Sequence, residues 1–181
     1  MANNIIITGA NQGIGYYMAE KLLAEGNKVS VLDIETNNLP NLQKKYDCLI
    51  FYKVDLRNYD EVKRVVDETI AEFDTIDIAV HNACKCTFES ESKTDLDTYK
   101  DVFDVNYFGA LRLVKCVIPY MSAQKKGRMI FHTSFSYNHP FKTLFFHTFN
   151  DFICFCYQFI HCHFRILFKF FSHCNYDCTL T

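Results

Sequence analysis

Short apolar runs alternate with longer amphipathic stretches over most of the first 136 residues of this chain. The apolar runs have the length of buried strands, which we predict at Asn4–Thr8, Lys28–Asp33, Leu49–Val54, Ile76–His81 and Arg128–Thr133. The amphipathic stretches have helical spacing and predict helices near Gly13–Glu25, Leu39–Tyr46, Tyr59–Phe73 and Tyr99–Ala123. Two pairs have the spacing of helix caps, namely Asn58 with Glu61 and Thr94 with Asp97. The alternation indicates an α/β fold, with a parallel sheet covered by helices on both faces.

A glycine-rich segment joins the first predicted strand to the first predicted helix. It reads Thr8-Gly9-Ala10-Asn11-Gln12-Gly13-Ile14-Gly15. A strand, a glycine turn and a helix in this order present a helix N-terminus, whose free N–H groups and dipole attract a pyrophosphate. In this interpretation Gly9 permits the tight turn, Gly13 lets the backbone approach the phosphates, and Gly15 lets helix and strand pack closely. The segment therefore predicts a dinucleotide site.

An acidic residue, Asp33, ends the second predicted strand. A carboxylate at this place in a βαβ unit accepts hydrogen bonds from the adenosine ribose and repels a 2′-phosphate. No arginine follows closely to pair with that phosphate. We therefore expect NAD as the cofactor, in preference to NADP. The alternative interpretation of Asp33 is a solvated acid at a strand end.

Composition and charge exclude some classes of function. The 181 residues suit one domain with a substantial core. A net charge of −2 without a basic run argues against a nucleic-acid partner. Because a strand is predicted so close to the N-terminus, we expect no export or transit segment and a cytoplasmic protein. Reduced thiols are expected there, and neither metal-type nor disulfide-type spacing occurs among Cys48, Cys84, Cys86 and Cys116.

The character of the chain changes at about Ser136. Residues 137–181 contain no Gly, Ala, Val or Glu, yet they hold eleven of the eighteen Phe, five of the nine Cys and five of the seven His. Residues 152–171 have the length of a membrane span, but polar side chains interrupt them, and the Cys and His lack paired zinc-ligand spacing. We expect neither a membrane span nor a metal site. We divide the chain into a dinucleotide-binding domain, 1–136, and an aberrant Phe-, Cys- and His-rich tail, 137–181. The tail is either translated out of the ancestral reading frame, which we favour, or a divergent closing segment.

Ordered motifs in residues 1 to about 136 resemble the short-chain dehydrogenase/reductase family. Thr8–Gly15 resembles its cofactor loop, and Asp55 with Leu56 resembles the acid after the third strand that contacts adenine. The family's Asn-Asn-Ala-Gly element resembles His81-Asn82-Ala83-Cys84, in which His81 and Cys84 depart from the pattern. The resemblance implies cofactor contacts from Asn82 and Ala83. It also implies a doubly wound Rossmann-type sheet with the strand order 3-2-1-4-5, which is truncated or aberrant after the fifth strand.

Two further segments resemble the catalytic half of the family's site. Asn106 lies in a segment, 104–109, that resembles the helix carrying the tetrad Asn, and Ser134 ends a segment that resembles the strand before the catalytic Ser. The resemblance implies an NAD(P)-dependent oxidoreductase of a small-molecule alcohol or carbonyl compound. Ser134 would hold the oxygen on which charge develops, and Asn106 would hold a water of the proton relay. The plainer interpretations are a turn serine and a polar helix residue.

The other two members of the family's tetrad are missing. The family uses a Tyr whose pKa is lowered by a Lys four positions later, and no Tyr after Ser134 has a Lys at that spacing. We therefore expect weak or no activity, and the alternative function is a non-catalytic nucleotide-binding remnant of a truncated dehydrogenase. An exposed fifth strand beside a Phe-rich tail also predicts poor solubility or association into homo-oligomers.

Overall fold

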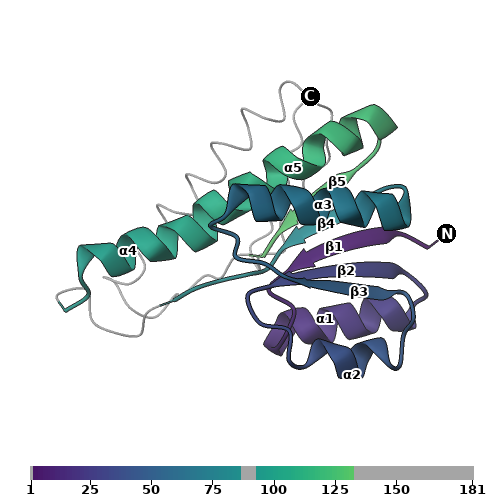
Figure 1. Ribbon diagram of the computed structural model, residues 1–181, viewed down its shortest axis with the longest axis horizontal. Coiled ribbons are helices and arrows are strands. Elements are labelled where there is room, and N and C mark those ends of the chain that lie inside the picture. Colours follow the sequence, from purple (N-terminus) through teal and green to yellow (C-terminus); the bar gives the residue numbers. More distant parts are fainter. Residues whose placement is uncertain (1, 87–92, 133–181) are drawn as a thin grey trace, which may run out of the picture.

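The computed structural model describes residues 2–86 and 93–132, which form an α/β fold around one sheet (Figure 1). Five strands make the sheet: β1 (Asn4–Thr8), β2 (Lys28–Asp33), β3 (Leu49–Lys53), β4 (Ile78–His81) and β5 (Arg128–Phe131). Their order is β3-β2-β1-β4-β5, and every neighbouring pair is parallel. The Rossmann-type order 3-2-1-4-5 is therefore confirmed.

Helices cover both faces of the sheet. α1 (Gly13–Ala24) and α2 (Leu39–Gln43) lie on one face, and α3 (Tyr59–Phe73) and α5 (Gly109–Gln124) lie on the other (Figure 1). Each face has its own core, and successive β1 residues enter opposite cores because strand side chains alternate: Ile5 and Ile7 pack towards α1, and Ile6 packs towards α3 and α5. This two-sided burial explains why β1 is a continuous apolar run.

The long helix expected at Tyr99–Ala123 is wrong in its start and in its continuity. α4 (Leu96–Phe103) begins three residues earlier, and its N-cap is Asp95, whose Oδ1 accepts a hydrogen bond from the N–H of Thr98 at 2.7 Å. Thr94 and Asp97 are not the capping pair. A π-helical turn, η1 (Asp104–Phe108), separates α4 from α5. Backbone hydrogen bonds in a π-helical turn span five residues, and the buried residues on either side of its start, Val102 and Tyr107, are accordingly five positions apart. Because such turns are rare, an uninterrupted α-helix was the expectation for this stretch.

Other boundaries differ by a few residues. Three strands are shorter than predicted, because β3 ends at Lys53, β4 begins at Ile78 and β5 ends at Phe131. The cap at Asn58 is confirmed, since its Oδ1 accepts hydrogen bonds from the N–H groups of Asp60 and Glu61 at 3.1 and 3.3 Å. The predictions on Thr133, Ser134 and the tail 137–181 lie outside the described residues.

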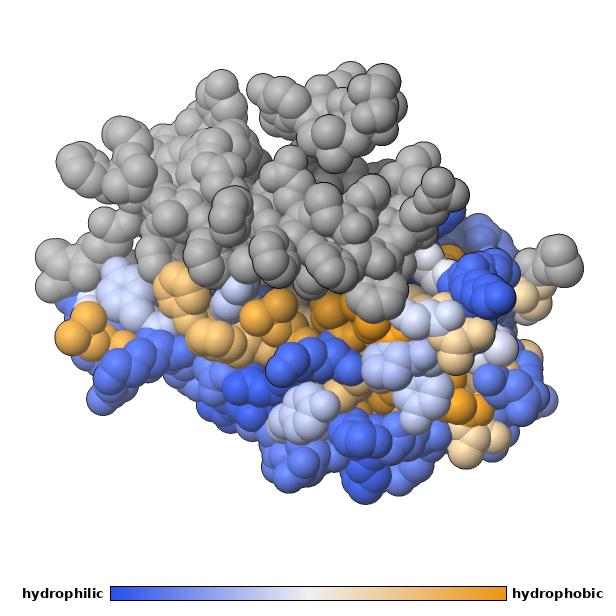
Figure 2. Space-filling view, turned by 90° about the horizontal axis from the view of Figure 1, so that it is seen from above, coloured by the Kyte–Doolittle hydropathy of each residue, from blue (hydrophilic) through white to orange (hydrophobic). Residues whose placement is uncertain are grey.

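On the face shown in Figure 2, the surface of the described residues is mostly polar, with hydrophobic residues in patches. Two large hydrophobic side chains are exposed on and just after α4, Leu96 at 74% and Phe108 at 48%. A hollow of about 630 Å³ lies beside them, lined by residues of α4 and η1. None of the described helices is long and apolar enough to cross a membrane.

Candidate dinucleotide site

The candidate site lies where β1 and β4 end side by side. Thr8 and His81 are the last residues of these strands and are paired in register. From this point β2 and β3 continue to one side of β1, while β4 and β5 continue to the other. The carboxyl edge of a parallel sheet at such a switch point is where open α/β folds bind ligands.

The glycine loop after β1 packs directly on the segment after β4. Gly9 has a φ of +68°, and a Cβ placed on it would lie 2.5 Å from the Cα of Ala83. A Cβ on Gly15 would lie 2.3 Å from the carbonyl oxygen of Gly9. Two of the three glycines are therefore needed for packing within the fold. Around Gly13 there is open space, with nothing within 4 Å of an added Cβ.

The first turn of α1 faces outward from this loop. Its N-cap, Gln12, has extended backbone and forms no side-chain cap hydrogen bond. Gln12, Gly13 and Ile14 are exposed, and the Ile14 residue is 64% accessible. The leading N–H groups of a helix lack carbonyl partners within the helix. This turn can therefore present N–H groups and the positive end of the helix dipole to an anion.

Asn11 has a structural role that sequence reasoning missed. It is only 3% exposed, and its Nδ2 donates to Oδ1 of Asn37 at 2.8 Å while its Oδ1 accepts from the N–H of Asn38 at 3.0 Å. Its backbone N–H donates to Oδ2 of Asp33 at 2.7 Å. Asn11 thus ties the glycine loop to the loop after β2, and the use of its amide there is not visible from sequence spacing.

Asp33 stands at the rim of the site, half-buried at the end of β2. Oδ2 accepts the hydrogen bond from Asn11 described above, and Oδ1 accepts one from the N–H of Glu35 at 3.1 Å. A carboxylate oxygen has more than one lone pair, so both oxygens keep acceptor capacity for a ribose hydroxyl. Lys53 at the end of β3 is the register partner of Asp33 and is exposed.

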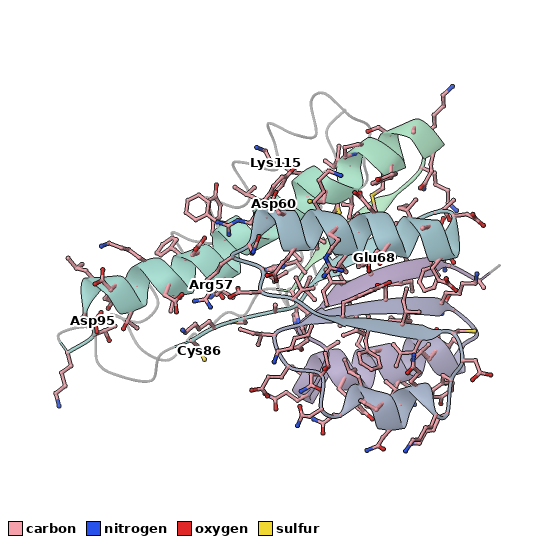
Figure 3. The ribbon with its side chains drawn as sticks, viewed as in Figure 1. Arg57, Asp60, Glu68, Cys86, Asp95 and Lys115 are labelled. Atoms are coloured by element: carbon pink, nitrogen blue, oxygen red, sulfur yellow. The ribbon has the colours of Figure 1, made fainter. Side chains whose placement is uncertain are left out.

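Asp55 is held in an ionic network along the same edge. The guanidinium of Arg57 contacts both carboxylate oxygens of Asp55, with its nearest nitrogen at 2.6 Å, and these hydrogen bonds lower the pKa of Asp55. Arg57 also pairs with Asp101 of α4 at 2.5 Å, and Lys85 pairs with the other oxygen of Asp101. Figure 3 shows Arg57 and Cys86 on the side of the molecule from which α4 projects. The network joins the loop after β3 to α4 and to the segment after β4.

The resemblance singled out Asp55 and Leu56 for adenine but missed Arg57. Its proximity to an acid two positions earlier is the only sequence signal for the pair. Leu56 is 6% exposed and packs against Gly109 at the start of α5, where an added Cβ would lie 3.1 Å from the Leu56 Cβ. The roles of Asp55 and Leu56 at adenine stay predictions.

Asn82 links three elements at the base of the site. Its Nδ2 donates to the carbonyl oxygen of Gly9 at 2.7 Å, and its Oδ1 lies 2.8 Å from Nδ1 of His132. The backbone N–H groups of Asn82 and Ala83 both donate to the hydroxyl of Thr8 at 3.2 Å. These contacts fix the position of the Asn82–Ala83 backbone relative to the glycine loop.

Asn106 lies in η1, across from the same segment. Its Oδ1 accepts from the N–H of Lys85 at 2.7 Å, and its Nδ2 donates to the carbonyl oxygen of Lys85 at 2.8 Å. Arg112 supports the wide turn by donating to the backbone oxygen of Asp104 at 3.1 Å and to its carboxylate at 2.7 Å. Ser134, the proposed partner of Asn106 in catalysis, lies outside the described residues.

Cys84 replaces the glycine of the resembled element and is exposed. The pKa of the Cys84 thiol is raised, mainly by partial burial of its sulfur and to a smaller extent by the charge of the nearby Cys86. The thiol is therefore not activated as a nucleophile. Within residues 2–86 and 93–132, no cluster of three metal-ligating side chains occurs.

Comparison with known proteins places the chain in a family. The family model described as short chain dehydrogenase matches residues 3–145. An uncharacterized oxidoreductase of Staphylococcus saprophyticus is 30% identical over 128 residues, which cover 70% of this chain and 52% of that protein. Galactitol 2-dehydrogenase of Agrobacterium fabrum is 33% identical over 129 residues, 69% of this chain and 49% of that enzyme.

Solved structures agree with this placement. A short-chain dehydrogenase from Streptomyces avermitilis superposes with a TM-score of 0.71 at 26% identity, covering 75% of this chain and 50% of that one. ElxO with NADP bound shares the fold, with a TM-score of 0.69 at 22% identity, and 74% and 56% of the two chains are covered. The chain spans about half the length of the curated relatives it matches. Because the family model matches most of its residues, the protein belongs to the short-chain dehydrogenase family.

Proposed function

We propose that this chain binds a nicotinamide dinucleotide along the carboxyl edge of its sheet, with NAD preferred over NADP. The observation that carries the proposal is the first turn of α1, which is exposed and lacks a side-chain cap directly after a loop packed tightly on the segment after β4. The N–H groups of Gly13, Ile14 and Gly15 are suited to the pyrophosphate, since they lie at the positive end of the helix dipole.

The remaining cofactor contacts follow the edge of the sheet. Asp33 is suited to the adenosine ribose, and the pair Asp55 and Leu56 to adenine, because they follow the ends of β2 and β3. Asn82 and Ala83 follow β4 and lie beside the glycine loop, towards the nicotinamide half. When bound, the nicotinamide ring donates or accepts the hydride. This chain's residues would bind and orient it.

The choice between NAD and NADP depends on two neighbouring charges. The Asp33 carboxylate repels a 2′-phosphate. Lys53, its register partner on β3, is exposed at the same edge and carries the opposite charge. We propose that Asp33 dominates, since its carboxylate is held in place by two backbone N–H groups, whereas a lysine ammonium is strongly hydrated on a flexible stem.

A substitution at Ile14 tests the pyrophosphate site without disturbing the core. Ile14→Asp places a negative charge in the first turn of α1. There the charge stabilises the helix by about 0.3–1 kcal/mol through its interaction with the helix dipole, but it repels a pyrophosphate. Ile14→Asn is the matched neutral control. We expect the Asp variant to retain its thermal stability and to bind NADH at least about tenfold more weakly than the Asn variant, a difference of about 1.4 kcal/mol. Equal affinity in the two variants would refute the site.

The reaction we propose is oxidation or reduction of an alcohol or carbonyl group in a small molecule, with Asn106 and Ser134 as the residues present from the tetrad. A second candidate is a binding module without catalysis, favoured by the lack of a Tyr-x-x-x-Lys pair after Ser134. A panel of alcohols and carbonyl compounds, assayed by the absorbance of NADH, separates the two. Turnover that falls in both Asn106→Ala and Ser134→Ala supports the enzyme, while NADH binding without turnover supports the binding module.

A further inference from the structure

His81 connects the cofactor loop to Asn106, and the proposed function makes no use of it. It ends β4, between Thr8 at the end of β1 and Phe131 of β5 in the register of the sheet. Only 5% of the residue is exposed. The imidazole Nδ1 lies 3.2 Å from Oγ1 of Thr8, and Nε2 lies 3.2 Å from the backbone oxygen of Asn106.

Thr8, His81 and Asn106 thus form a chain of hydrogen bonds. The other hydrogen bonds of Thr8 determine where the protons in this hydrogen-bond chain lie. Oγ1 of Thr8 accepts from two backbone N–H groups, those of Asn82 and Ala83. A hydroxyl has two acceptor lone pairs and one proton, so the proton of Thr8 points to its third partner, Nδ1 of His81. Nδ1 is therefore unprotonated, and Nε2 carries the hydrogen and donates it to the oxygen of Asn106. Burial lowers the pKa of His81 to about 4, which agrees with a neutral ring.

The two ends of this hydrogen-bond chain lie in segments of the proposed site, the glycine loop at Thr8 and η1 at Asn106. Thr8 holds the N–H groups of Asn82 and Ala83, and Ala83 is the backbone on which Gly9 packs. At the other end, the Asn106 side chain is already paired with the Lys85 backbone by two hydrogen bonds. The bond from His81 holds the backbone of the same residue within the wide turn η1, so its position is set from two sides.

We propose that His81 is a positioning residue that couples the dinucleotide loop to Asn106 through the chain Thr8–His81–Asn106. A dinucleotide that shifts the loop would move the Thr8 hydroxyl, and the imidazole would pass this movement to η1. The coupling rests on the proposed cofactor site, whereas the proton arrangement of the chain does not depend on it. The two parts are therefore tested separately.

The first experiment uses the full chain without cofactor. A long-range proton–nitrogen NMR spectrum of 15N-histidine-labelled protein at pH 7, with His81 assigned by His81→Gln, reports which ring nitrogen carries the proton. We expect an unprotonated Nδ1 and a protonated Nε2. A proton on Nδ1, or rapid exchange between the two imidazole tautomers, would overturn the proposed proton arrangement of the hydrogen-bond chain.

The second experiment follows the side-chain amide of Asn106, assigned by Asn106→Asp, during titration with NADH. We expect the signal to move in the wild type, to stay in place in His81→Phe, and to move again in His81→Gln, whose amide can accept from Thr8 and donate to Asn106. If His81→Phe does not fold, the coupling is decided by Thr8→Val, which removes the hydroxyl at the other end. A signal that moves equally in every variant, or that stays in place when the wild type binds NADH, would overturn the coupling. Failure of the wild type to bind NADH contradicts the proposed function instead.

Discussion

Acid should destabilise this protein through His81. Burial lowers the pKa of His81 from 6.5 to about 4, and a difference of one in pKa between the folded and unfolded states is worth about 1.4 kcal/mol. Because the unfolded chain binds the proton first, the free energy of unfolding is unaffected above about pH 6.5 and falls as the pH drops towards about 4. The full effect is about 3 kcal/mol, a large part of the 5–15 kcal/mol or so that is typical of a domain.

The assay is urea unfolding of the wild type and His81→Gln at several pH values between 7 and 4. Glutamine keeps both hydrogen-bonding functions but does not titrate, so we expect the wild type to lose up to about 3 kcal/mol relative to the variant over this range. The aspartates with lowered pKa, such as Asp55 and Asp77, lose their contribution at lower pH and do so in both proteins.

Among the described residues His132 is the other histidine, and its backbone N–H donates to the His81 carbonyl at 2.9 Å directly after β5. His132→Gln is therefore the control, since it removes the second imidazole and leaves His81 in place. Parallel curves for the wild type and His81→Gln would refute the reasoning, and a flat curve for His132→Gln would assign the loss to that residue instead.

Three further predictions concern packing and specificity. Thr69→Val removes the hydroxyl that lies 2.8 Å from the buried Ser30 hydroxyl. Because Ser30 then lacks this partner, urea unfolding should show a free energy of unfolding lower by about 1–3 kcal/mol. The decrease should be smaller when Thr69→Val is made in Ser30→Ala. Gly9→Ala should cost more than about 1 kcal/mol, because its Cβ would lie 2.5 Å from the backbone after β4, and more than Gly26→Ala, where φ is also positive but the space is open; an equal cost would contradict the packing argument. Asp33→Asn should raise the affinity for NADPH relative to NADH by about tenfold, or 1.4 kcal/mol, and an unchanged ratio in fluorescence titrations would show that Asp33 does not select the cofactor.

Hydrophobic periodicity predicted the bounds of the helices and strands whose hydrophobic pattern is regular along their whole length. β1, β2 and α3 begin and end where the hydrophobic pattern indicated, because each is a mainly apolar run or a clean amphipathic stripe. The stretch between Thr94 and Ala123 was predicted less well. There a local hydrogen bond selected Asp95 as the cap, and η1 interrupts the helix with a π-helical turn, a rare element that α-helical spacing does not predict.

The part of the candidate site that could be predicted is the part that depends on backbone conformation. A glycine between a strand and a helix indicates a turn, and the structure has a positive φ at Gly9 and Gly13. The partners of polar side chains were not predictable, since they come from segments far apart in the sequence. Arg57 with Asp101, and Asn11 with Asn37, are contacts of this kind.

By itself, the sequence determined the class of fold, the glycine loop and the family, because each depends on local residue order: a strand, a turn and a helix that repeat. The tertiary structure decided what the polar residues around that loop contact. Thr8 and His81 are 73 residues apart, and His81 and Asn106 are 25 apart, yet they form one chain of hydrogen bonds. Parallel pairing places the ends of β1 and β4 side by side, and burial there leaves each polar group to find its partner within the protein.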